Sequence, residues 1–246
     1  METQEGMRIL VDGGSSDKKS LYEQSILPFL KSRGVRKIDY AVVTHPDEDH
    51  ISALRELIRE GEIRVKLLLL PAISREMQDE AYLELLALAD ETDTAVGFLS
   101  AGDRLQMGRL AVTCLYPYRG LETTDRNGYS TVLEVCYGEF SMLLTGDLDE
   151  KGESFLVKQL KGKEKVYDVL KIAHHGSRFS TGEEFLSKIR PEYAVISCGR
   201  RNSYGHPHQE VLQRLAEAEV KVFITPETGA VIWESDGKES RIIDIR

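Results

Sequence analysis

The sequence predicts an α+β fold in which two β-sheets pack together, with helices outside both sheets. Strand and helix patterns alternate along all 246 residues, in two halves. No linker, repeat or low-complexity segment interrupts them, so we expect one domain over residues 1–246. Four apolar runs end directly in loops rich in histidine, aspartate and glycine, which is typical of ligand-binding edges in layered folds.

The first half is predicted to contain three strands and three helices. Apolar runs predict strands at 9–11, 38–43 and 65–70. Helical spacing predicts helices over 20–32, 51–60 and 74–90. Asp12-Gly13-Gly14 is a turn signal after the first strand, and Pro28 implies a kink or a late helix start. Gly61 ends the second helix, and Ser74 is the expected N-cap of the third.

The second half continues the same alternation. Short strands are expected between 96 and 116, followed by a hairpin of 131–137 and 140–145 across Gly138-Glu139. Further strands are predicted at 167–173, 193–198, 220–225, 231–234 and 241–245. Helices are predicted near 150–160, 181–189 and 208–218.

The loop after the strand at 38–43 is the strongest functional signal. Its sequence, Thr44-His45-Pro46-Asp47-Glu48-Asp49-His50, places two imidazoles and two aspartates within six residues. Imidazole and carboxylate groups are ligands of divalent metal ions, and a strand end holds them firmly. The pattern therefore predicts a metal site.

Three later strand ends repeat this pattern. Apolar runs stop at Gly146-Asp147, at His174-His175-Gly176-Ser177 and shortly before Tyr204-Gly205-His206-Pro207-His208. All six histidines of the chain lie just beyond such runs, which scattered surface histidines would not do. We therefore expect these loops to converge on one site.

Composition excludes several classes of protein. The charged fraction of 30% and the hydrophobic fraction of 41% are ordinary for a globular protein, and no apolar run reaches the ~20 residues of a membrane span. The acidic N-terminus lacks a signal-peptide core, so a soluble, cytoplasmic chain is expected. The net charge of −9 argues mildly against nonspecific binding to a polyanion, although bound dications would offset it locally. Cys114, Cys136 and Cys198 are expected to be core thiols.

The ordered motifs resemble those of a known family. His45–Ser52, Leu144–Asp147, Leu170–Ser177 and Asn202–Pro207 resemble the motifs of metallo-β-lactamase-fold hydrolases. The chain is most similar to the C-terminal domain of the ComEC-type DNA-internalisation channel of competent bacteria. This resemblance implies a four-layer αββα sandwich with a dinuclear site at one edge of its sheets. The family's first N-terminal strands and the channel's membrane helices have no counterpart here, so an extracytoplasmic location is implied if the chain is a fragment of such a channel.

The resemblance also implies a set of metal ligands, for two ions of Zn or Mn. One ion would be held by Asp49, His50, His175 and a bridging Asp147, and the other by His45, Asp47 and the same Asp147. Asp47 stands where the family usually has a second histidine, and a carboxylate there makes Mn²⁺ plausible beside Zn²⁺. His175 is expected to be the ligand because the family's ligand precedes glycine. His174 is then expected to face the substrate or to support the ligand shell.

Catalytic and substrate-binding roles are implied for further residues. Asp49, His174 and His206 are the catalytic candidates, with His206 as a phosphate hydrogen-bond donor or general acid. His208 is instead expected to mark the entry of a helix, and Arg178, Arg200 and Arg201 to lie on the rim of the site. The candidates for substrate binding are Asn127, Ser130, Ser177, Asn202 and Tyr204. An Asn127-Gly128 turn and a capping role for Ser177 are equally good interpretations of those two residues.

The leading functional hypothesis is a metal-dependent phosphodiester hydrolase, a nuclease of DNA uptake with a metal-bridging hydroxide as its nucleophile. Its partners would be DNA or another phosphodiester and a membrane DNA-uptake channel. One alternative is a small-substrate phosphodiesterase similar to phosphorylcholine esterases, which needs an aromatic cage. The candidates for that cage are Tyr116, Tyr118, Tyr129 and Trp233. Another alternative is a non-catalytic accessory module that binds nucleic acid.

Overall fold

The computed structural model describes residues 1–160 and 166–245, and the side chains of these ranges up to residue 243. It divides into two compact units. Unit 1 consists of Met1–Ser100 and Tyr118–Arg126, and unit 2 consists of Ala101–Pro117 and Asn127–Arg246. Helices and sheets are mixed in both, so the predicted α+β class is confirmed.

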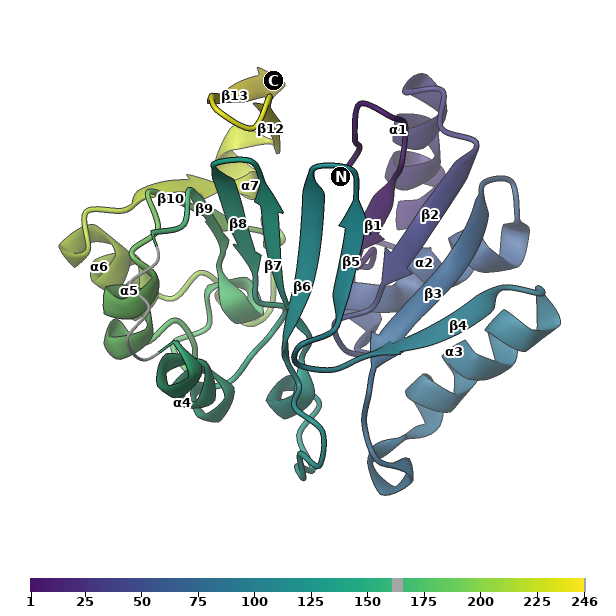
Figure 1. Ribbon diagram of the computed structural model, residues 1–246, viewed down its shortest axis with the longest axis horizontal. Helices are drawn as coiled ribbons and strands as arrows, with labels where there is room; N and C mark the ends of the chain where they lie inside the picture. The colour runs from purple at the N-terminus through teal and green to yellow at the C-terminus, as the bar shows by residue number, and fades with distance from the viewer. Residues whose placement is uncertain (161–165, 246) are drawn as a thin grey trace. The chain divides into compact units, whose positions relative to one another are not determined.

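Unit 1 contains a four-stranded parallel sheet. Its strands, in the order β1-β2-β3-β4, are Ile9–Val11, Lys37–Val42, Arg64–Pro71 and Ala95–Leu99. Its helical segments are the π-helix η1 (Tyr22–Ile26), α1 (Leu27–Ser32), α2 (Glu48–Glu60), the 3-10 turn η2 (Arg75–Met77) and α3 (Glu80–Glu91). Figure 1 shows α2 and α3 side by side on one face of this sheet, where their apolar sides join the strands in one core. Because all four strands are parallel, their carboxyl ends share one edge.

Two helix starts in unit 1 differ from the prediction. Helix α2 begins at Glu48 and not at Ile51, so Asp49 and His50 lie in its first turn. Acidic side chains in a first turn are stabilised by the helix dipole, which explains the earlier start. Helix α3 begins at Glu80, because the Asp79 side chain accepts the N–H of Tyr82 at 3.0 Å. Ser74 makes no such cap bond and precedes only the turn η2.

Unit 2 contains a seven-stranded sheet in the order β11-β10-β9-β8-β7-β6-β5. The strands are β5 (Arg104–Met107), β6 (Leu110–Tyr116), β7 (Val132–Tyr137), β8 (Phe140–Leu144), β9 (Val169–Lys171), β10 (Tyr193–Ile196) and β11 (Lys221–Ile224). Strands β5 to β8 are antiparallel and include the predicted hairpin, whereas β8 to β11 run parallel. The loops after β8, β9 and β10 therefore leave the sheet at the same edge.

The remaining elements of unit 2 lie around this sheet (Figure 1). They are the 3-10 turns η3 (Asn127–Tyr129) and η4 (Ala173–Gly176), the helices α4 (Glu150–Gln159), α5 (Glu183–Ile189), α6 (Gln209–Glu217) and α7 (Thr225–Thr228), and the hairpin of β12 (Ala230–Ser235) with β13 (Ser240–Ile245). The three cysteines are free thiols, of which Cys114 is buried and the other two are half-buried.

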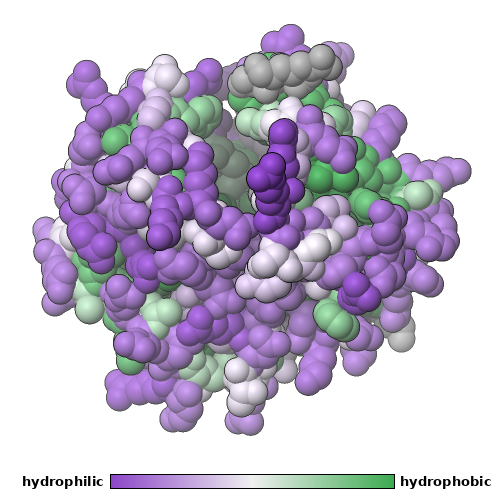
Figure 2. All heavy atoms as spheres, turned by 180° about the vertical axis from the view of Figure 1, so that it is seen from behind, coloured by the Kyte–Doolittle hydropathy of each residue, from purple (hydrophilic) through white to green (hydrophobic). Residues whose placement is uncertain are grey.

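The face drawn in Figure 2 is largely hydrophilic, with apolar residues in separate patches. Among the helices of the described residues, none combines the length and the apolar composition that a membrane crossing requires.

Candidate metal centre

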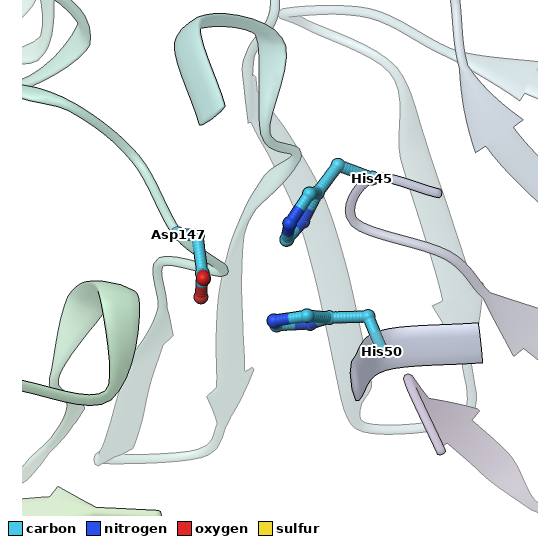
Figure 3. A group of neighbouring side chains, drawn as sticks. All are labelled: His45, His50 and Asp147. Atoms are coloured by element: carbon cyan, nitrogen blue, oxygen red, sulfur yellow. The ribbon is translucent and has the colours of Figure 1, made fainter. Parts of the chain in front are cut away.

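Unit 1 brings two histidines of the sequence motif together. His45 lies in the loop after β2 and His50 lies in the first turn of α2. Their ring centroids are 4.1 Å apart, and both side chains are buried (Figure 3). Buried imidazoles need hydrogen-bond partners for their ring nitrogens, so the partners reveal which nitrogen remains for a ligand.

Asp12 is the partner that orients this pair. Its Oδ2 lies 2.8 Å from Nδ1 of His50 and accepts the hydroxyl of Thr44 at 2.8 Å, while its Oδ1 accepts the Thr44 N–H at 2.8 Å. Burial opposes ionisation of Asp12, but the charge and hydrogen bond of His50 and the N–H of Thr44 outweigh it, and the pKa is lowered. Asp12 is therefore a carboxylate, and His50 donates to it from Nδ1.

The same network fixes the ring of His45. Nδ1 of His45 lies 3.1 Å from Oγ1 of Thr44. Because the Thr44 hydroxyl hydrogen points to Asp12, its oxygen accepts here and His45 donates from Nδ1. As neutral imidazoles, both histidines thus present Nε2 with a lone pair, which is the form that binds a metal ion.

Two glycines after Asp12 allow this arrangement. Gly13 donates its N–H to the carbonyl of His50 at 2.7 Å, which ties the β1 loop to the first turn of α2. A Cβ on Gly14 would lie 2.6 Å from the carbonyl oxygen of Glu48, a backbone atom that cannot move aside. The close approach that brings Asp12 to His50 therefore requires glycine.

Asp47 lies at the entry of α2, between a histidine and an arginine. Its Oδ1 receives Nη1 of Arg126 at 2.7 Å, and its Oδ2 lies 3.5 Å from Nε2 of His45. Arg126 also binds Asp79 through Nε. Burial alone would raise the pKa of Asp47, but the neighbouring His45 and Arg126 lower it to about 2. Asp47 is thus a carboxylate with one oxygen held by Arg126 and the other facing His45.

Unit 2 assembles a second cluster at the shared edge of β8, β9 and β10. Asp147, drawn in Figure 3, follows β8, is buried, and donates its backbone N–H to Oγ of Ser130 at 2.9 Å. His174 and His175 lie in η4 after β9, with Nε2 at 4.0 Å and 3.5 Å from Oδ2 of Asp147. Nδ1 of His175 lies 2.7 Å from the carbonyl oxygen of Ser197, which can only accept, so in the neutral imidazole Nε2 of His175 carries the lone pair.

The backbone at these histidines is strained. His174 (φ 50°, ψ 44°) and His175 (φ 54°, ψ 18°) are consecutive non-glycine residues in the left-handed region, which costs about 1–3 kcal/mol each. Such strain is concentrated at functional sites. Gly176 follows with φ 89°, and a Cβ there would lie 2.7 Å from Cβ of Pro207, so glycine lets the loop of His206 approach.

Comparisons with known proteins agree with this geometry. Residues 2–106 match the model of the metallo-beta-lactamase superfamily. The chain is 35% identical over 212 residues to ComE operon protein 3 of Bacillus subtilis, covering 86% of this chain and 26% of that protein. It is 33% identical over 212 residues to competence protein ComA of Neisseria gonorrhoeae, covering 85% of this chain and 27% of that protein. The chain thus spans about a quarter of the length of these curated relatives.

A solved structure shows the same fold. The metallo-beta-lactamase fold protein YhfI of Bacillus subtilis aligns with a TM-score of 0.55 at 13% identity, over 88% of this chain and 83% of that one. The chain has a metallo-β-lactamase domain. Its predicted fold and its resemblance to ComEC-type competence proteins are confirmed.

The donor atoms of this metallo-β-lactamase domain fit divalent metal ions. In unit 1, Nε2 of His45 faces a carboxylate oxygen at 3.5 Å, and in unit 2 Nε2 of His175 does the same. Two lone-pair donors repel each other unless a cation lies between them. Two ligands about 2.0–2.2 Å from one ion are separated by roughly 3.4 Å at a tetrahedral angle, close to the spacing in both units.

His206 lies next to the histidines of unit 2. Its ring centroid is 5.6 Å from that of His174 and 6.3 Å from that of His175. Burial and the neighbouring His174, His208 and His175 lower the pKa of His206 to about 4. The ring is therefore neutral at pH 7, which favours hydrogen-bond donation over the role of general acid.

The five predicted substrate-binding residues differ from one another in burial and in hydrogen-bond partners. Ser130 is buried and accepts the N–H of Asp147, and Ser177 is buried within the turn that follows His175. Asn202 binds the backbone of its own loop at Gly199 and His206. Asn127 lies half-buried in η3, so the Asn127-Gly128 turn is present, whereas Tyr204 is exposed.

The sequence analysis did not identify three residues of the site. They are Asp12, Arg126 and Thr44, whose hydroxyl connects Asp12 with His45. Asp12 follows an apolar strand-like run directly, the same signal that marked the other loops, but its two glycines favoured a turn. Arg126 lies 79 positions from Asp47, and no local pattern indicates that pairing.

Proposed function

We propose that the chain is a metal-dependent phosphodiester hydrolase, and specifically a nuclease linked to DNA uptake. The observation that supports it most is the orientation of His45, His50 and His175. Each has Nδ1 bound to a protein oxygen, so each presents Nε2 as a metal ligand. Histidine ligands held in this way are typical of metal sites.

The proposed ligand sets join the clusters of the two units. One ion would be held by Asp49, His50, Asp147 and His175, and the other by His45, Asp47 and Asp147. Asp47 adds a hard oxygen ligand to the second set, which suits Mn²⁺ as well as Zn²⁺. Divalent ions bound there supply an activated water and positive charge against the phosphate.

The chain's own residues would divide the remaining work. Asp49, in the first turn of α2, would accept a proton from the attacking water. His174 and His206 would donate hydrogen bonds to phosphate oxygens. Ser130 holds the backbone of Asp147 and so keeps the shared carboxylate in place.

The link to DNA uptake is supported by the relatives. One of them is named a competence protein, and another is a product of the ComE operon. From these names we propose that DNA is the substrate of the chain. Because the chain spans about a quarter of the relatives' length, we also propose that a membrane uptake channel is its partner. Action at the extracytoplasmic face would follow from that partnership.

The phosphorylcholine-esterase alternative has less support. It requires an open aromatic cage for a quaternary ammonium group. Tyr116 and Tyr129, two of the four candidates for that cage, are each 2% exposed. Rings buried in this way cannot line an open cage.

End-labelled DNA with Mn²⁺ tests the proposal, comparing wild type with Asp147→Asn. Loss of the shared carboxylate should reduce cleavage by several orders of magnitude. Asp168→Asn is the matched control, because Asp168 directly precedes β9 and binds Ser141 and not the histidines. Equal cleavage by wild type and Asp147→Asn would contradict the proposal.

A further inference from the structure

The two most exposed large hydrophobic side chains of the described residues are both aromatic and both belong to unit 2. Phe179 is 72% exposed and Tyr204 is 65% exposed, whereas the next value in this group is 53%. Single exposed apolar residues are common and need no explanation. These two lie on the loops that also contain His174, His175 and His206, so their exposure coincides with the proposed catalytic cluster.

Tyr204 ends a row of rings that leads to the histidine ligand. Its ring lies 5.6 Å from His206 at an interplanar angle of 19°, and His206 lies 6.3 Å from His175 at 21°. Each ring is therefore tilted by only 19° or 21° from its neighbour in the row. A flat group stacked on Tyr204 would extend this row outward from His175.

Phe179 is connected to the same row. The N–H of the preceding residue, Arg178, donates to Nδ1 of His208 at 3.1 Å, and the His208 ring lies 4.9 Å from His206. The loop containing Phe179 thus contacts the loop containing Tyr204.

Both loops are held by side-chain hydrogen bonds. Nη2 of Arg214 donates at 3.1 Å to the carbonyls of Arg178 and Ser180, on either side of Phe179. Asn202 spans the loop of Tyr204, with bonds of 2.8 Å to Gly199 and of 2.7 and 2.8 Å to the backbone of His206. Rings on loops held in this way lose little conformational freedom on binding, which favours a binding role.

The chemistry of the two rings points to one ligand class. Aromatic faces on a surface stack with unpaired nucleobases, whereas bases in a duplex are already stacked inside it. The exposed Arg200 and Arg201 lie on the loop of Tyr204 and add positive charge to a chain whose net charge is −9, whereas Arg178 is paired with Glu210 at 2.9 Å. Base stacking also supplies affinity that the acidic chain cannot obtain from phosphate contacts alone.

We propose that Phe179 and Tyr204 form a stacking platform for unpaired nucleobases, so that the protein takes single-stranded nucleic acid beside its histidine cluster. This inference rests on the proposed function and names the substrate class of that site.

Binding of a fluorescein-labelled oligothymidylate tests this platform, measured by anisotropy in a chelator so that the strand is not cut. Tyr204→Ala and Phe179→Ala should each weaken binding about tenfold, and the double variant about 100-fold. Tyr204→Phe should bind like wild type because the ring remains. Phe98→Ala removes an exposed phenylalanine of unit 1 and should change nothing.

An abasic strand of the same length separates the platform from the hydrolase. Wild type should bind the abasic strand as weakly as the double variant binds oligothymidylate. The variants should bind the abasic strand with the same affinity as wild type. Equal binding of both strands by wild type, or unchanged binding by the double variant, would overturn the platform. Failure of wild type to cut either strand with Mn²⁺, with discrimination between strands retained, would leave the platform supported and reject only the hydrolase.

Discussion

Individual residues show how much of this site depends on groups that never touch a substrate. Asp12, Thr44 and the carbonyl of Ser197 fix the three imidazoles through Nδ1. Such outer partners typically contribute 10–100-fold to metal affinity. Their geometry fixes the direction of each candidate ligand.

Replacement of Asp12 should therefore weaken metal binding without removing a ligand. We expect Asp12→Asn to reduce the affinity for Mn²⁺ or Zn²⁺ about 10–100-fold, measured by calorimetry. Asp39→Asn is the matched control, because Asp39 is also buried and accepts a backbone N–H between β1 and β2, from Arg8 at 3.0 Å. If both variants bind metal like wild type, Asp12 does not orient His50.

The sequence predicted the ligand candidates at this scale better than their partners. The local sequence pattern, histidine or aspartate directly after an apolar run, identifies the candidates. The structure places His45 next to His50 and His175 next to Asp147. Arg126 and the Ser197 carbonyl reach the site only through tertiary folding, so no spacing rule finds them. The neutral state of His206 likewise depends on its surroundings in the fold.

Among the elements, strand positions were predicted well, whereas the starts of α2 and α3 were not. Alternating apolar runs located β2, β3 and the β7–β8 hairpin. The starts of α2 and α3 depend on which acidic residue begins the first turn, and several polar residues in each loop could do so. This error matters for function, because it moves Asp49 and His50 from a loop into a helix.

The segment between η4 and α5 is held by a buried carboxylate. Glu153 of α4 is 3% exposed, and its two oxygens accept the N–H groups of Thr181 and Gly182. Burial raises the pKa of Glu153 to about 7, although these N–H groups partly offset the shift. The folded protein therefore binds this proton more tightly than the unfolded chain does, whose reference value is 4.5.

Stability should consequently fall as pH rises from about 4.5 through 7. The contribution of Glu153 to this loss is on the order of 3 kcal/mol. The glutamine in Glu153→Gln stays neutral at every pH. The free energy of unfolding of this variant, measured in urea, should therefore rise relative to that of wild type between pH 5 and pH 8. Glu150→Gln, at an exposed position of the same helix, should keep a constant difference from wild type. A constant difference for Glu153→Gln as well would show that Glu153 does not titrate in this range.

At the scale of the whole molecule, the proposed function draws its candidate ligands from both compact units. Unit 1 supplies His45, Asp47, Asp49 and His50, and unit 2 supplies Asp147 and His175. The proposal that these residues share metal ions rests on the ligand set that the family resemblance implies. The sequence predicted one domain because no linker separates the halves, and that prediction remains to be tested.

The most direct test is the Mn²⁺-dependent cleavage rate of a labelled single strand by His50→Ala, His175→Ala and the double variant. Residues that act as one unit show strongly non-additive losses. If both histidines serve one site, each single variant should lose about as much activity as the double variant, on the order of a thousandfold or more. Losses that multiply in the double variant, or a single variant that cuts like wild type, would contradict a site shared by the two units.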